Sequence, residues 1–599
     1  MDRLRALLVV GDALAQSIEP ADDLLRASHL CDAGDELLAD ALVRSQANVL
    51  IHQRAIEPAT FRRWRVGLRS ALLISVRLGE ESLPVASSAH PEEWARAEGD
   101  CEGVRLLAVP TSEDMLSRAL GAAERVRQNE DSPRADSPRA EASWSRSRRP
   151  PTVLMVGLGV VNLVTAHWLA RAGFEVSAVD AGPDPRLGES WKRYGCSRGG
   201  ANARMFTLTE ADDYHDRTLG RPPVHAQFRR PVSLRGWQLC APGAAEEEWI
   251  GDFERVPAWL ARAYNADTLA LNRASGALWD TWIQADPHLF ADVELTRDIV
   301  RIYSDAGQFA ESLRRQDSVG ATKQVYTPAQ LRAAQPALAD APAEAIAGCI
   351  VVEGFTLCVH DLMAALLDDL EAAGADLRFE TRVSELLRDG EGRVMGALTG
   401  DHVVRSDHFV LSLGAEFSSL SPPPALRNRV HGVLGCWATV PNIEPRLTAS
   451  VKLARRGHNA EDANVTVARD PLGDPILVFG SGYGYVGSRG KIDESELEAL
   501  YRALVDTVRV YFPRALDAAG KDRVRESFRH CVRPWTASNL GVFETEPTPR
   551  GLAVWTGGHN TGGFAQAPVI AEAVHTALSG GRHAMHVAYS PRRWAAGAT

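Results

Sequence analysis

The stretch TVLMVGLGVVNLVTAHWLARAGFEVSAVD at residues 152–180 decides how the larger part of the chain folds. Its first five residues form a continuous apolar run, which is typical of a strand buried on both faces of a parallel sheet. A turn with glycine at two positions follows, and an apolar helical pattern then ends at Gly173, a residue type that favours helix C-termini. The strand pattern EVSAV comes next and leads to Asp180. This order predicts a β-α-β unit of a parallel sheet.

The unit has the spacing of a dinucleotide-binding site. Gly157 permits the tight turn, and Gly159 lets the backbone approach a pyrophosphate at the N-terminus of the helix. Asp180 is twenty-three residues beyond Gly157, where a carboxylate can accept a hydrogen bond from a ribose hydroxyl. Asn162 replaces the third glycine of the G-x-G-x-x-G pattern, which normally permits close packing of helix on strand. This departure concerns the position of the helix, and we keep Asn162 among the predicted cofactor-binding residues.

A second stretch, GYGYVG at residues 482–487, matches the G-x-G-x-x-G string better. It follows an apolar run, but the residues after it do not open a helix. A dinucleotide site needs the strand, the turn and the helix together. We therefore reject this second stretch as a nucleotide site.

The chain has three regions of different composition. Residues 127–151, RQNEDSPRADSPRAEASWSRSRRPP, repeat DSPRA and are rich in serine, proline and charge, which predicts a disordered linker. Residues 1–126 have apolar residues at three- and four-residue spacing and are predicted to form a mostly helical domain with a structural, regulatory or partner-docking role. From residue 152 onward, short β-branched runs alternate with longer amphipathic ones, which is typical of an α/β domain.

Composition and charge exclude several classes of protein. With 45% apolar and 24% charged residues, the chain is predicted to be globular, and its formal charge of −11 gives no reason to expect nucleic acid or an anionic membrane as a partner. Eight cysteines without C-x-x-C spacing favour a reducing cytoplasm, and no cluster of histidine, cysteine and aspartate has metal-ligand spacing. No apolar run has the length of a membrane span. We expect a cytoplasmic protein without a catalytic metal.

Three further segments resemble the D-amino-acid oxidase superfamily of FAD-dependent oxidoreductases, which includes glycine oxidase and monomeric sarcosine oxidase. They are GFTLCVHDLMAALLDDLEAAGADLRFETRVSELL at 354–387, HFVLSLGA at 408–415 and CVRPWTASNLGVFETEPTPRGLAVWTGGHNTGGFAQAPVIAEAV at 531–574. The resemblance covers roughly residues 152–590. It implies a Rossmann-like FAD-binding domain and an α+β substrate domain built on a β-sheet. The FAD-binding domain would comprise residues 152–235, 345–420 and 548–599, and the substrate domain 236–344 and 421–547.

The resemblance also implies contacts with FAD. Val383 would meet the adenine through its backbone, Gly414 would pass close to the cofactor, and Gly199 and Gly200 would lie in a loop over the face of the flavin. A glycine-rich turn before the last helix would bring backbone donors to the flavin, and the positive end of that helix would stabilise a reduced, anionic flavin. The glycines of this turn are Gly557, Gly558, Gly562 and Gly563.

Cys531 occupies the position at which sarcosine oxidases attach FAD covalently. In this chain Arg-Pro follows shortly after it, as in members of the superfamily with noncovalent FAD. Covalent attachment through Cys531 is therefore possible but not favoured. The alternative is a buried free cysteine that packs as a small hydrophobe.

Four residues are predicted to take part in substrate binding or catalysis. Arg533 offers a planar fork for a substrate carboxylate, or pairs with an acid at the edge of the core. Arg204 is a second anion contact, a contact to the flavin phosphates or a surface partner of Glu210. His559 bonds the flavin edge, assists oxygen reduction or stabilises its turn. Tyr483, like Tyr485, gates the pocket, stacks on substrate or packs in the interior.

The predicted function is oxidation of the C–N bond of an amino acid or small amine to an imine. One dinucleotide unit is recognisable, so the electrons are expected to come from the organic substrate, and dioxygen is the expected acceptor, giving hydrogen peroxide. Two alternatives remain open. The chain is a dehydrogenase that passes electrons to a protein or a quinone, or it binds flavin without catalysis while the N-terminal domain docks a protein partner.

Overall fold

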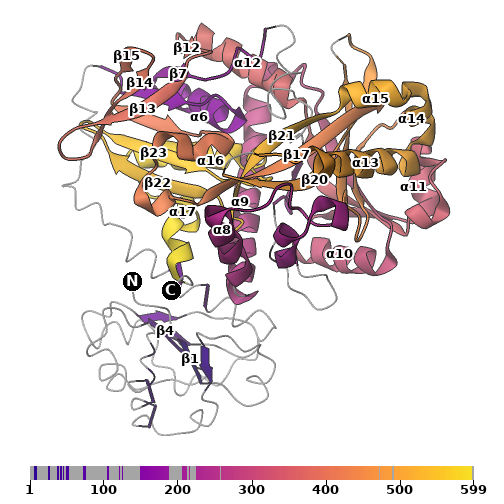
Figure 1. Cartoon of the computed structure of the whole chain (residues 1–599), viewed down its shortest axis with the longest axis horizontal. Helices are drawn as coiled ribbons and strands as arrows, with labels where there is room; N and C mark the ends of the chain where they lie inside the picture. Colours follow the sequence, from indigo (N-terminus) through magenta and orange to yellow (C-terminus); the bar gives the residue numbers. More distant parts are fainter. Residues whose placement is uncertain are drawn as a thin grey trace.

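The computed structural model describes residues 149–187, 205–211, 215, 224–256, 258–470, 472–488 and 491–596, together with short segments and single residues between 6 and 125 (Figure 1). The predicted β-α-β unit lies at the centre of a six-stranded sheet. In spatial order the strands are β12 (Asp376–Arg378), β7 (Glu175–Val179), β6 (Thr152–Val156), β16 (His408–Leu411), β23 (Leu552–Gly557) and β22 (Val542–Pro547). Five of them are parallel, and β22 runs antiparallel to β23. The prediction of a Rossmann-like domain is thus confirmed.

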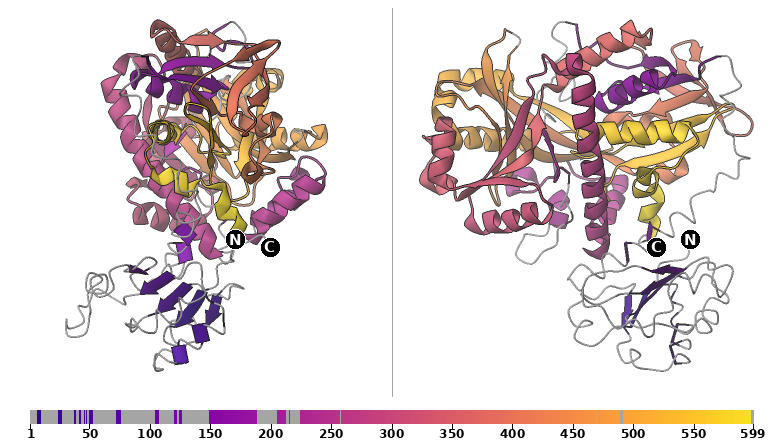
Figure 2. Two further views of the ribbon diagram at one scale, coloured as in Figure 1. Left: turned by 90° about the vertical axis from the view of Figure 1, so that its left-hand side faces the viewer. Right: turned by 180° about the vertical axis from the view of Figure 1, so that it is seen from behind.

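Helices pack on this parallel sheet because its strands are apolar on both faces. Helix α6 (Val160–Arg171) joins β6 to β7 and packs against α16 (Ala567–Leu578) and α12 (Val359–Ala372). The long helix α9 (Ala258–Ala285) packs in turn on α16 (Figure 2). Buried side chains of these helices and strands form one apolar cluster. This cluster holds the N-terminus of α6 in place at the edge of the sheet.

A second, larger sheet of nine strands carries the other half of the site. Its path is β10 (Thr322–Tyr326), β11 (Gly348–Thr356), β9 (Thr296–Tyr303), β18 (Ser450–Ala454), β19 (Asp462–Arg469), β20 (Pro475–Gly487), β17 (Val430–Pro441) and β21 (Arg529–Thr536), and β8 (Met205–Thr207) pairs with β11. Helix α13 (Glu494–Tyr511) packs against β20 and β17. The prediction of a substrate domain built on a β-sheet agrees with this arrangement.

The strand pairings differ from the predicted domain boundaries at three places. Strands β8 and β11 join the nine-stranded sheet, whereas residues 152–235 and 345–420 are predicted to belong to the FAD-binding domain. Strand β22 joins the six-stranded sheet, whereas residues 421–547 are predicted to belong to the substrate domain. Which strands pair depends on their register and on which edges meet in the folded chain, and sequence motifs do not give this information. The GYGYVG stretch lies at the end of strand β20 and does not form a turn that opens directly into a helix.

The described part of the N-terminal segment contains a parallel sheet that the sequence analysis did not predict. Its order is β2 (Leu24–Arg26), β1 (Ala6–Val9), β3 (Val49–His52), β4 (Leu72–Ser75) and β5 (Val104–Leu106). The prediction of a mostly helical segment missed these strands. A short apolar run such as VLIH is compatible with a helix or a strand. The reason is that a strand buried on both faces lacks the alternation of apolar and polar residues that would identify it.

Among the described residues, no helix has both the length and the hydropathy that a membrane crossing requires.

A buried ion-pair cluster ties the N-terminal segment to the rest of the chain. Arg593 is fully buried, and its guanidinium donates to both carboxylate oxygens of Glu124 at 2.7 Å and to Asp267 at 2.9 Å. Arg125 donates to the same Asp267 at 2.9 Å, and the Arg593 guanidinium lies 4.8 Å from the centre of the Tyr264 ring. The cluster therefore joins Glu124 and Arg125 to helix α9 and to the C-terminal end of the chain. Of the predicted linker, residues 127–151, only residues 149–151 are among those that the structure describes.

We expect Arg593→Met to lower the free energy of unfolding by about 3–5 kcal/mol, because it leaves the buried carboxylate of Glu124 without its cation and removes one of the two cations beside Asp267. The matched control is Arg502→Ala, which removes an arginine that is 77% exposed and lies 3.4 Å from Glu498. Breaking that surface pair is expected to cost less than about 1 kcal/mol. Urea unfolding of both variants measures the difference, and equal costs would contradict this account of the cluster.

Candidate active site

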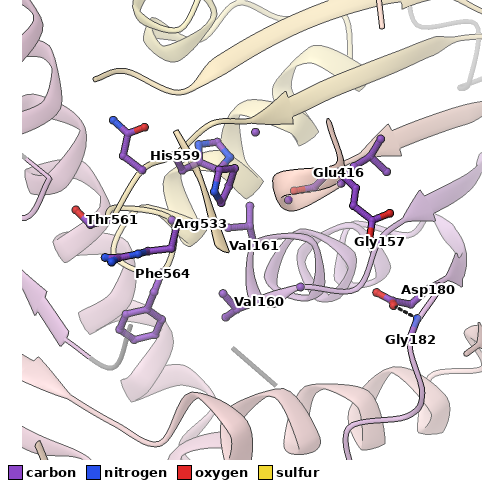
Figure 3. Close-up of a pocket in the computed structure, with 18 of the residues that line it drawn as sticks. Gly157, Val160, Val161, Asp180, Gly182, Glu416, Arg533, His559, Thr561 and Phe564 are labelled. Atoms are coloured by element: carbon purple, nitrogen blue, oxygen red, sulfur yellow. Dashed lines mark hydrogen bonds between the residues drawn. The ribbon is translucent and has the colours of Figure 1, made fainter. Parts of the chain in front are cut away.

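One continuous cavity of about 530 Å³ connects the two sheets (Figure 3). Gly157, Gly159 and Asp180 line it from the six-stranded sheet, and Lys452 and Arg533 line it from the nine-stranded sheet. Its volume lies in the range of clefts that hold cofactors and small ligands. The predicted dinucleotide site and the predicted carboxylate site therefore belong to the same cavity.

The turn between β6 and α6 presents bare backbone to this cavity. Gly157 has a φ of +88°, and a Cβ on it would lie 2.5 Å from the carbonyl oxygen of Ser412 on the neighbouring segment. Gly159 is the N-cap of α6, and a Cβ there would meet no atom within 4 Å. The unpaired N–H groups of the first helical turn thus face open space, which is the arrangement that binds a phosphate.

Asp180 connects this turn to the end of β7. Its carboxylate is buried and accepts hydrogen bonds from the backbone N–H of Leu158 and from that of Gly182, each at 2.7 Å (Figure 3). Each carboxylate oxygen has further acceptor capacity, and the side chain lines the cavity. Asp180 can therefore fix the shape of the turn and still accept from a ribose hydroxyl.

Asn162 supports the turn from behind and does not line the cavity. Its side-chain amide donates to the carbonyl oxygen of Gly157 at 2.7 Å and to that of Val156 at 3.2 Å. These bonds hold helix α6 against the end of β6. In the usual pattern the third glycine achieves this by letting the helix pack closely on the strand. In this structure the Asn162 amide supports the turn, and its role in cofactor binding stays a prediction.

The other predicted cofactor residues fall into three groups. Val383, Gly414 and Gly563 line the cavity, with Val383 as the first residue of β13 (Val383–Arg388). Gly558 and Gly562 belong to the turn between β23 and α16 but are not part of the lining. Gly558 has a φ of +63°, and a Cβ there would lie 2.4 Å from Thr536, so it shapes the turn. Gly199, Gly200 and Arg204 lie outside the described residues.

Arg533 is on β21 and reaches over β17 toward β20. Its Nη2 donates to the carbonyl oxygens of Gly482 at 2.8 Å and Leu434 at 3.4 Å, while its Nε is buried without a partner in the described part of the chain. A Cβ on Gly435 would lie 2.1 Å from Nη2, so the guanidinium passes where a side chain is missing. These contacts use Nη2 of the guanidinium and leave its Nε as a donor for an anion.

Tyr483 lies beside this arginine in the cavity. The Arg533 guanidinium is 5.3 Å from the centre of the Tyr483 ring, and Trp237 stacks on that ring at 4.5 Å. Tyr485 points elsewhere: it is buried, and its hydroxyl lies 2.7 Å from His431 Nδ1. The structure therefore separates the two tyrosines, with Tyr483 at the cavity and Tyr485 in the packed interior.

His559 lines the cavity from the glycine-rich turn. Burial lowers the pKa of its imidazole to about 4, so the ring is neutral at neutral pH. Its Nε2 lies 3.2 Å from the Thr556 hydroxyl, and its Nδ1 is buried without a partner in the residues that the structure describes. A neutral ring can exchange hydrogen bonds with a ligand, but it brings no positive charge to the site.

Cys531 does not line the cavity. It is half-buried and packs against an apolar cluster that includes Trp437 and Val478. These contacts favour the interpretation of Cys531 as a small apolar residue.

Among the polar residues of the cavity that the sequence analysis missed as members of the site are Glu210, Lys452, Asp462 and Asn464. They come from segments without a recognisable motif. One signal was present for Lys452, because a lysine stands among apolar residues in the strand sequence SVKLA, where a charge is costly unless it has a function.

The residues present fit an FAD molecule. The glycine turn and the N-terminus of α6 suit its pyrophosphate, Asp180 suits a ribose, and the backbone near Val383 borders the same region of the cavity. The turn before α16 suits the flavin end, because Gly563 and Phe564 of this turn line the cavity near the positive end of the helix.

Comparison with known proteins gives the same result. The profile of the DAO family, described as FAD dependent oxidoreductase, matches residues 152–576. The chain is 26% identical over 429 residues to a D-amino acid dehydrogenase of Bradyrhizobium diazoefficiens, a match that covers 69% of this chain and 91% of the relative. A protein of the same name from Dechloromonas aromatica is 24% identical over 454 residues, covering 72% of this chain and 97% of the relative.

Among solved structures, glycine oxidase from Bacillus cereus is similar in fold, with a TM-score of 0.50 and 15% identity over 72% of this chain and 95% of that one. The family profile spans both sheets and most of the chain, and the cavity between the sheets fits the cofactor of that family. The chain belongs to the DAO family of FAD-dependent oxidoreductases.

Proposed function

We propose that this enzyme is an FAD-dependent amino-acid dehydrogenase that acts on D-amino acids. The observation that carries the proposal is that the dinucleotide turn and an arginine with unused donors line one cavity. The names of the relatives support the substrate class and its configuration. They also favour an organic electron acceptor over the dioxygen that we predicted from the sequence.

Arg533 would bind the substrate carboxylate. Its Nη2 is engaged by backbone carbonyl groups, so Nε, which is buried without a partner in the described part of the chain, is the donor left for a carboxylate oxygen. Tyr483 supports the guanidinium through its ring face and is itself held by Trp237. A fixed carboxylate positions the α-carbon, and positioning is the main demand of this reaction.

When bound, FAD supplies the two-electron oxidant for the C–N bond. The amine substrate loses two electrons and two protons and becomes an imine, which water converts to an oxo acid and ammonia. No side chain needs to act as a strong acid or base on carbon. His559, neutral at neutral pH, would hold its place in the turn and add a hydrogen bond without adding charge.

Gly157→Ala is expected to weaken FAD binding by at least tenfold, because the new Cβ would collide with Ser412 and displace the turn. The control is Gly173→Ala, which has a similar φ of +90° but no neighbour within 4 Å of its Cβ. Both variants carry comparable backbone strain, on the order of 1 kcal/mol. Titration of the apoprotein with FAD, followed by flavin fluorescence, measures the two affinities. Equal loss in both variants would mean that the turn is not the phosphate site.

Arg533→Met is expected to lower kcat/KM for an amino acid by roughly 100-fold, which corresponds to about 3 kcal/mol for a charge-assisted carboxylate contact. Arg529→Met is the matched control. Arg529 is on the same strand four residues earlier, donates to the backbone carbonyls of Glu526 and Phe528, and does not line the cavity. Steady-state kinetics with both variants test the assignment, which fails if the two lose activity to the same extent.

The electron acceptor can be tested directly. We expect a reduced quinone-type dye to accumulate with amino-acid turnover, and hydrogen peroxide under air to account for less than about a tenth of it. This expectation follows from the dehydrogenase proposal. A stoichiometric peroxide yield would instead identify an oxidase. A flavin that no amino acid or amine bleaches without air would support flavin binding without catalysis.

A further inference from the structure

We propose that the site selects amino acids whose side chain ends in an uncharged group that both accepts and donates hydrogen bonds, of which a carboxamide is the simplest. This inference rests on the proposed function and names the substrate class of the same site. It starts from polar groups that line the cavity opposite Arg533 and that the reaction itself does not use.

Lys452 and Asn464 form a polar wall on the nine-stranded sheet. They are directly opposite each other on β18 and β19, so their side chains are on the same face, and both line the cavity. Asn464 is in turn opposite Gly480 on β20. Two strand spacings, together roughly 10 Å, separate the backbone of Lys452 from β20.

Two glycines of strand β20 line the cavity between this wall and Arg533. They are Gly480 and Gly482, and the Arg533 guanidinium rests on the carbonyl oxygen of Gly482 at 2.8 Å. A ligand whose carboxylate binds Arg533 can therefore extend over the glycines toward Lys452. The distance suits an amino acid with a side chain of several atoms.

Polar groups at the Lys452 end of the cavity have no hydrogen-bond partners in the described part of the chain. Glu210 Oε2 and Asn464 Oδ1 are buried without a hydrogen bond, and Lys452 has neither a hydrogen bond nor an ion pair within 4.0 Å among those residues. Buried polar atoms are normally satisfied, so such groups in a cavity indicate a ligand. An apolar side chain would leave all of them unpaired, and a site of this kind rejects analogues that lack the matching group.

The charged groups around Lys452 balance one another, and this balance favours a ligand with an uncharged side chain. Burial opposes the charge of Lys452, but the carboxylates of Glu210 and Asp462 outweigh it and raise the pKa of the lysine above its ordinary value, despite the nearby Arg301. Lys452 therefore stays cationic and donates. The positive charges of Lys452 and Arg301 balance the negative charges of Glu210 and Asp462. A substrate side chain with a charge of either sign therefore gains no net electrostatic attraction from these four groups. A neutral group that accepts from Lys452 and donates to Glu210 satisfies both.

The test compares D-glutamine, D-methionine, D-glutamate and D-lysine, which have similar lengths and differ in the chemistry of their ends. We expect kcat/KM for D-glutamine to exceed that of each of the other three by at least tenfold. Lys452→Met should remove at least tenfold from the value for D-glutamine and leave that for D-methionine within about twofold. Lys323→Met is the control, because Lys323 is on strand β10 of the same sheet, is paired with Asp298 and lies outside the cavity lining.

A binding measurement separates failure of this inference from failure of the proposed function. Glutaramate and hexanoate, which lack the amino group, can be titrated against the absorbance of the bound flavin. We expect glutaramate to bind at least tenfold more tightly than hexanoate, and Lys452→Met to abolish the difference. If hexanoate binds as well, or if Lys452→Met lowers kcat/KM for D-methionine and D-glutamine equally, the inference is wrong. If no amino acid reduces the flavin while glutaramate still binds preferentially, the inference holds and the proposed reaction fails.

Discussion

The cavity depends on one steric constraint, the absence of a side chain at Gly157. The turn passes so close to the carbonyl oxygen of Ser412 that a single Cβ would collide with it, and the φ of +88° is also one that other residues rarely adopt. Asp180 fixes this arrangement from the next strand by accepting from Leu158 and Gly182. Backbone donors at the start of α6 are thereby held open, and the rest of the site is arranged around them.

The two sheets divide the work of the site between them. The parallel sheet supplies backbone donors and a carboxylate, which is sufficient for a dinucleotide but recognises no particular substrate. The nine-stranded sheet supplies side chains that a substrate can meet, with Arg533 reaching in from β21 and Lys452 from β18. Gly480 and Gly482 of β20 line the cavity between these two side chains. An enzyme of this kind can change its substrate by changing strand residues while its cofactor site stays the same.

Several polar residues near the cavity act by supporting others. Asn162 ties the first turn of α6 to the end of β6, and Tyr483 with Trp237 supports the guanidinium of Arg533. Arg593 has a comparable task far from the cavity, because it joins Glu124 of the N-terminal segment to helix α9 through Asp267. Their side chains are held by named contacts, and such contacts keep a site in its working geometry.

The sequence alone determined the nucleotide-binding unit, because its strand, turn, helix and acid are consecutive and each residue type has a local physical reason. The resemblance to a known family indicated Val383 and Gly414 and supported the choice of Arg533 and Gly563, and all four line the cavity. The tertiary structure alone decided the roles of Asn162 and Tyr483 and the presence of Glu210, Lys452 and Asn464 in the site, since these depend on which strands pair. It also revealed a parallel sheet in the N-terminal segment, where short buried strands carry no periodicity that distinguishes them from helix.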